Sequence, residues 1–174
     1  MTSPIRRTPV PSDVEIEIEE STAHHWVAWV GDLLIVFVYE GSHDDTGHVT
    51  TAARVIERLH RRRGTPLSVL FVFPAMLGKS PTARVRNAIV DAARRLEGTV
   101  ARVSIVVLGT GFGPALHRSA ATGLIALVRP RSTWKIHATL SEALTSLLGR
   151  SHPGLSAILA RCETELRARD APRD

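Results

Sequence analysis

The sequence contains a single cysteine, Cys162, among 174 residues. One cysteine cannot form an internal disulfide or supply a multi-cysteine zinc site, so disulfide-rich scaffolds and zinc ribbons are excluded. A lone cysteine is also typical of proteins that reside in a reducing compartment. We therefore expect a chain held together by its apolar core, which a chain of 174 residues is long enough to bury.

Long apolar runs are missing as well. No stretch reaches roughly 18 consecutive apolar residues, the length that a membrane-spanning helix requires, so no membrane span is expected. Residues 1–13 are polar and proline-rich, and they lack the apolar centre of a secretory signal. We expect these residues to form a flexible N-terminal arm, and a cytoplasmic location follows as the default expectation.

Lysine and aromatic residues are scarce. The formal charge is +5, yet only Lys79 and Lys135 are lysines, and aromatic side chains make up 5% of the chain. An arginine-rich and lysine-poor composition most often reflects a GC-rich genome. The charge is modest for a nucleic-acid binder, and the aromatics are not interleaved with basic residues as base-stacking platforms would be. No nucleic-acid partner is expected.

Hydrophobic periodicity indicates strands first and then helices that alternate with strands. Residues 14–20 alternate between apolar and acidic side chains, which predicts a strand with one wet face. Apolar strands are expected over residues 24–30 and 33–40, with a hairpin turn at Gly31 and Asp32. The later spacing predicts helices over 46–62, 81–96, 114–128, 140–148 and 155–166, and strands over 67–73, 100–108 and 134–138.

These elements predict an α/β fold with a single mixed β-sheet. The chain begins as an antiparallel meander and continues as β-α-β-α-β-α-β, because strand–helix alternation implies parallel pairing through right-handed crossovers. The helices are expected to pack on at least one face of the sheet. We expect three parts: the flexible arm over residues 1–13, an α/β domain over 14–149, and a C-terminal helix and tail over 150–174.

The stretch from residue 103 to residue 128 organises this fold, because a buried strand, a glycine turn and an apolar helix follow one another. The helix is apolar on most faces, so we expect it to be nearly sequestered. The turn precedes a helix N-terminus, whose amides and dipole attract anions. The ligand- or anion-binding candidates are therefore Gly109, Thr110, Gly111, Phe112 and Gly113.

That turn does not match a dinucleotide fingerprint. The fingerprint has the spacing G-x-G-x-x-G, whereas the turn has G-x-G-x-G-P, so a dinucleotide site is not expected. The alternative is that the glycines serve only to turn the backbone. Residues 73–80 approach a P-loop in the same incomplete way, because Phe73 replaces the first glycine and Pro81 removes an amide.

The sequence also contains two clusters of polar residues. His43, Asp45 and His48 are metal-ligating residue types, but no other part of the sequence completes the set, so a polar turn is favoured and no metal or cofactor is expected. Five arginines at positions 54, 58, 61, 62 and 63 form a positive edge on one helix. That edge fits a solvated face, an acidic partner or a phosphorylated ligand. No complete catalytic set is present, so an enzyme is not expected.

The layout of strands and helices is similar to a known family. The residues that carry the likeness are 103–109 with Gly111 and Phe112, then 121–124, Arg129 with Pro130, and 140–144 after the short strand. Over roughly residues 14–149 the chain resembles the STAS-like (anti-sigma-factor-antagonist-like) proteins. Within that family it is most similar to small bacterial proteins of unknown function, as in myxobacteria.

The resemblance implies a non-enzymatic regulatory or protein-interaction module of STAS-like type, with a protein partner or a second copy in a homodimer. Antagonists of the family carry a phosphorylatable serine at the start of the helix after the central strand, and Ser80 occupies that place here, preceded by Lys79. The lipid-binding relatives of the fold imply an alternative. In that alternative the protein binds a small molecule or lipid, with the turn at 109–113 and the helix N-terminus as the rim of the site.

Overall fold

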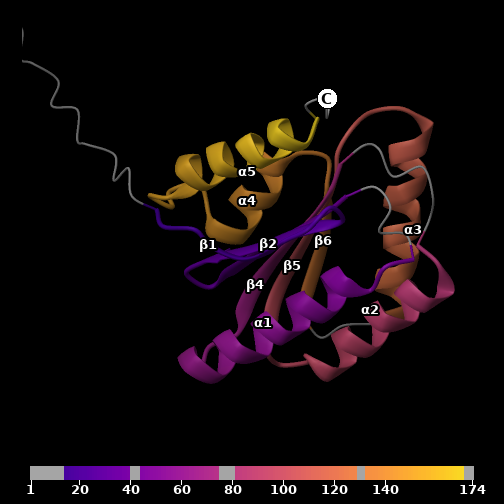
Figure 1. Ribbon diagram of the computed structural model, residues 1–174, viewed down its shortest axis with the longest axis horizontal. Helices are drawn as coiled ribbons and strands as arrows, with labels where there is room; N and C mark the ends of the chain where they lie inside the picture. The colour runs from indigo at the N-terminus through magenta and orange to yellow at the C-terminus, as the bar shows by residue number, and fades with distance from the viewer. Residues whose placement is uncertain (1–13, 40–43, 75–80, 129–131, 171–174) are drawn as a thin grey trace, which may run out of the picture.

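A computed structural model describes residues 14–39, 44–74, 81–128 and 132–170 (Figure 1). Six strands form one mixed sheet in which spatial neighbours follow chain order. The first three strands pair antiparallel, and the later pairs are all parallel, as the sequence predicted. The strands are β1 (Glu17–Ser21), β2 (His25–Val30), β3 (Leu33–Val38), β4 (Leu67–Phe73), β5 (Val100–Val107) and β6 (Thr133–His137).

Five helices cover both faces of this sheet. The three crossover helices lie on one face, and the two C-terminal helices lie on the other (Figure 1). The first group comprises α1 (Gly47–Arg63), α2 (Ala83–Arg95) and α3 (Phe112–Val128). The second group comprises α4 (Leu140–Leu148) and α5 (Leu155–Asp170). The sheet is therefore the middle of three layers, and its central strands are buried on both sides.

The face under α4 and α5 is filled by large side chains. The rings of Trp26 and Phe37 meet edge to face with their centroids 5.4 Å apart. Ile158 and Cys162 of α5 join the same buried cluster. The Tyr39 hydroxyl donates to a carboxylate oxygen of Glu165 at 3.0 Å, which ties α5 to the end of β3. This side of the domain is a conventional close-packed core.

Most predicted elements are confirmed within one or two residues, and the strand over 67–73 has the predicted bounds. The helix predicted over 81–96 begins later, at Ala83, and its N-cap is Thr82, whose hydroxyl accepts from the amide of Val85. Ser80, which the resemblance places at the start of that helix, lies outside the described residues. No helix in the described ranges is long and apolar enough to cross a membrane.

The alternation predicted for the first strand fails in its second half. A bulge between Ile18 and Glu20 inserts one extra residue, which moves the following side chains to the opposite face. Glu19 and Glu20 are therefore half-buried against α1, whereas Ile18, which precedes the bulge, is 51% exposed. Arg58 of α1 donates two hydrogen bonds to the Glu19 carboxylate, so part of the arginine edge is neutralised within the chain.

Helix α3 also departs from expectation, because it is not sequestered. Every described side chain over 113–128 is half-buried or exposed. Leu116 and Leu127 are 50% and 63% exposed, and a spacing of eleven residues places them on the same side of the helix. The physical reason is position, since α3 packs on β5 and β6 at one end of the sheet and the sheet stops at β6.

The N-caps of α4 and α1 offer a matched test of this local structure. Thr139 accepts from the Glu142 amide at 3.2 Å, whereas the N-cap Thr46 makes no side-chain capping bond. We expect Thr139→Ala to lower the free energy of unfolding by about 1 kcal/mol, because a capped amide loses its partner. Thr46→Ala should change it by less than about 0.5 kcal/mol. Urea denaturation of the two variants measures both, and equal losses would contradict the assigned caps.

Candidate functional site

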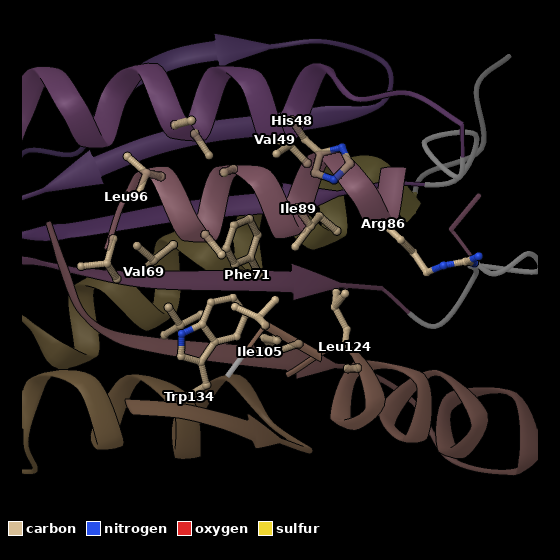
Figure 2. Close-up of a pocket in the computed structure, with 18 of the residues that line it drawn as sticks. His48, Val49, Val69, Phe71, Arg86, Ile89, Leu96, Ile105, Leu124 and Trp134 are labelled. Atoms are coloured by element: carbon tan, nitrogen blue, oxygen red, sulfur yellow. The ribbon is translucent and has the colours of Figure 1, made fainter. Parts of the chain in front are cut away.

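Helix α2 makes its main contacts with α1 and α3 rather than with the sheet. Beneath it lies a cavity of about 290 Å³ (Figure 2). Its floor is formed by side chains of β4, β5 and β6, among them Phe71, Ile105 and Trp134. Its roof is formed by Ile89 of α2 and by Leu96, the C-cap residue of that helix. The described residues therefore place a hollow on the face of the sheet opposite to the close-packed core.

Short side chains explain why the space is not filled. Each of the three helices over the cavity contributes a pair of alanines to its wall, and an alanine side chain extends only one carbon from the backbone. These pairs are Ala52 and Ala53 of α1, Ala92 and Ala93 of α2, and Ala120 and Ala121 of α3. Large residues at these six positions would close the gap between helix layer and sheet. The cavity therefore stays open because these six side chains are small.

Polar groups line the cavity at its two ends. His48, Arg86 and His117 come from the N-terminal parts of α1, α2 and α3, next to the carboxyl ends of β4 and β5. This edge is where open α/β sheets bind ligands, and the three helix dipoles are positive there. The opposite end has Arg94 and Glu97. Apart from these, Ser132 and the Trp134 indole, the described lining is apolar or glycine.

His48 has an unusual environment within this lining. Its side chain belongs to a residue that is 3% exposed, and its Nδ1 has no hydrogen-bond partner among the described residues. Burial, together with the nearby His25, lowers the pKa of His48 from its ordinary 6.5 to about 4, while Asp45 acts in the opposite direction. The ring is therefore a neutral imidazole at pH 7, and it forms part of the cavity wall.

The predicted glycine turn lies between β5 and α3, at the same edge of the sheet. Gly109 and Gly111 both adopt a φ of 97°, a conformation that glycine adopts without strain, which explains their presence. Gly109, Thr110, Gly111 and Gly113 are exposed, and the described lining of the cavity includes none of them. The side chain of Phe112 lies outside the described residues. Ligand binding by this turn stays a prediction.

The structure describes only some of the other predicted site residues. Ser80 and His43 lie outside the described residues, so phosphorylation of Ser80 stays a prediction. The Asp45 carboxylate accepts a hydrogen bond from the Gly47 amide at 2.9 Å and thereby provides a partner for the first amide of α1. Within the described ranges no group of three histidine, cysteine or acidic residues could hold a metal ion. His48 belongs instead to the cavity wall.

One polar contact was not anticipated from the sequence. Ser104 of β5 and His137 of β6 lie with their Oγ and Nε2 atoms 3.2 Å apart. Ser104 is 1% exposed, and the pair joins two strands beneath α4. Cys162 is buried as well, and burial raises the pKa of its thiol to about 12, which leaves it protonated at pH 7.

The lowered pKa of His48 predicts a pH-dependent stability. As the pH falls from 6.5 to 4, the unfolded chain takes up a proton that the native ring resists, so stability decreases over this window. The full loss in the free energy of unfolding amounts to about 3 kcal/mol. Urea denaturation of the native chain and of His48→Phe between pH 7 and pH 4 measures it. We expect the variant to gain stability relative to the native chain as the pH falls. A difference in stability that stays constant with pH would contradict the lowered pKa of His48.

Comparison with known proteins adds no further assignment. No protein-family model, curated protein or solved structure matches this chain. The mixed α/β fold follows from the structure itself. The STAS-like resemblance stays a prediction that the residue pattern alone supports.

Proposed function

We propose that this protein binds a small apolar molecule in the cavity beneath α2. The observation that carries the proposal is the size and apolar lining of that cavity, about 290 Å³. A ligand that fills the hollow removes its apolar walls from water, which stabilises the complex by about 25 cal/mol per Å² of apolar surface covered.

The volume sets the size of the molecule. A methylene group occupies about the same volume as a water molecule in the liquid, about 30 Å³, so about 290 Å³ holds a chain of roughly ten carbon atoms. An apolar protein cavity of about half this volume stays dry and binds benzene. The lining rings of Phe71 and Trp134 also suit an aromatic ligand, because ring faces stack with offset geometry.

A neutral aromatic probe tests the proposal directly. We expect 1-methylnaphthalene, which has eleven carbon atoms and no hydrogen-bonding group, to raise the midpoint of thermal unfolding. At about 100 times its dissociation constant it stabilises the native state by about 2.7 kcal/mol, or about 5 to 10 °C for a chain of this size. The midpoint is followed by circular dichroism.

Two phenylalanine substitutions on α3 provide the control. Ala121 lines the cavity, whereas Ala126 is exposed and is not among the described lining residues. Ala121→Phe should fill the hollow and abolish the rise in midpoint, and Ala126→Phe should leave it intact. No rise with the native chain, or an equal rise with both variants, would overturn the proposal.

A second candidate is the protein-contact role that the STAS-like resemblance implies, in the form of a homodimer. The exposed apolar side of α3, with Leu116 and Leu127 aligned on it, favours this role. Exposed apolar side chains that share one side of a helix favour such a role, because large exposed apolar patches mark interaction sites in soluble proteins. The adjoining strand β6 ends the sheet among the described residues, so a second copy that packs on α3 would also lie beside a strand edge.

The second candidate is tested through the solution mass. We expect the native chain to have the mass of two copies in light scattering, and the double variant Leu116→Glu with Leu127→Glu to have the mass of one, because buried charges oppose association. Ile18→Glu, at an exposed isoleucine on β1, should leave the mass unchanged. A monomeric native chain, or a dimer that survives both glutamates, would overturn the homodimer.

A further inference from the structure

The polar end of the cavity contains a buried nitrogen atom without a partner. His48 is 3% exposed, and its Nδ1 makes no hydrogen bond within the described residues. Figure 2 shows the ring projecting from α1 toward Ile89 of α2, on the cavity side. Buried polar atoms are normally hydrogen-bonded, because leaving one unpaired costs about 1 to 3 kcal/mol. The apolar side chains that line the cavity supply no such partner, and the Asp45 backbone, which lies near the ring, raises the pKa of His48.

A second imidazole at the same end has a defined hydrogen position. His117 of α3 lies with its Nδ1 3.0 Å from the carbonyl oxygen of Gly113. A carbonyl oxygen can only accept, so Nδ1 donates, and Nε2 of the neutral ring has a lone pair. That Nε2 is also buried without a partner among the described residues, and His117 lines the cavity. The polar end therefore contains an acceptor without a partner, which a ligand reaches by displacing the side chains that cover it.

The charges around this end do not favour an anion. The Arg86 guanidinium donates to the Pro81 carbonyl at 2.7 Å on the exposed rim. Two carboxylates lie close by, Asp44 as the acceptor of the Thr82 hydroxyl and Asp45 beside His48. Their negative charge offsets the positive charge of Arg86 and of Arg118, whose guanidinium donates to the Val107 carbonyl at the end of β5. The remaining titratable neighbour of His48 is His25, which is buried.

We propose that the cavity takes an apolar molecule that ends in a hydroxyl group, with the hydroxyl at the end lined by His48 and His117. This inference rests on the proposed binding function and specifies its ligand class. A hydroxyl both donates and accepts, so it pairs with the Nε2 lone pair of His117 and with either form of the His48 nitrogen. A carboxylate only accepts and would face the lone pair of His117 without a donor.

Three probes of equal chain length separate these ligand classes. Decan-1-ol has the hydroxyl, 1-methoxydecane has an oxygen that only accepts, and decanoate has a negative charge. Titration calorimetry of the full chain at pH 7.5 compares their dissociation constants. We expect decan-1-ol to bind about fivefold more tightly than 1-methoxydecane, the ratio that a hydrogen bond worth about 1 kcal/mol produces. Decanoate should bind more weakly than decan-1-ol.

Histidine variants assign that preference to the two rings. His48→Phe and His117→Phe should each lower the alcohol-to-ether ratio toward one while 1-methoxydecane still binds. His117 is half-buried, so its variant keeps the test available if His48→Phe fails to fold. The matched control is His60→Phe in the last turn of α1, where Nδ1 lies 3.0 Å from the Thr65 carbonyl and the ring lies outside the described cavity lining. This control should keep the full ratio.

The outcomes distinguish hydroxyl recognition from the binding of apolar molecules in general. Equal affinity for the alcohol and the ether, or tightest binding of decanoate, would overturn hydroxyl recognition and leave the apolar binding function standing. A ratio that survives both histidine variants would also overturn it. No binding of any of the three probes, together with no effect of 1-methylnaphthalene, would overturn the proposed function itself.

Discussion

The parallel pairing of β3 to β6 in chain order is the constraint on which the rest of the structure depends. Each crossover carries its helix to the same face, because the connection between parallel strands has a fixed hand. The three crossover helices therefore lie side by side in one layer, with their N-termini at one edge of the sheet (Figure 1). The middle helix, α2, is supported by its two neighbours, and the space beneath it remains unfilled.

The two faces of the sheet differ in how closely their side chains pack. Under α4 and α5, aromatic and aliphatic side chains such as Trp26, Phe37 and Leu144 are almost completely buried in one cluster. Under α2, the alanine pairs of three helices leave a hollow of about 290 Å³. A domain can tolerate such a hollow only if burial elsewhere compensates, and the opposite face provides that burial. The two candidate functions meet at α3, which lines the cavity on one side and exposes leucines on the other.

Charge pairing fixes the first strand to this framework. The bulge in β1 turns Glu19 and Glu20 toward α1, where Arg58 donates to Glu19 and Thr51 donates to Glu20. These hydrogen bonds lower the pKa of both carboxyl groups. The arginines of α1 are thus partly occupied within the chain, which reduces the positive charge available to an acidic partner. A bulge of one residue decides this outcome, and an alternating sequence pattern does not reveal it.

The sequence by itself determined the order of the elements and the mixed sheet, because periodicity and turn residues act over a few residues. It also identified His48 as a polar residue of interest, although as a metal-ligand candidate. Only the tertiary structure brought His48, Arg86 and His117 to one end of a cavity, since they lie on three helices far apart in the chain. It likewise left α3 half-exposed, because burial depends on where the sheet ends. Alanine pairs are ordinary in helices, so the empty space that they border appears only when the three helices are placed over the sheet.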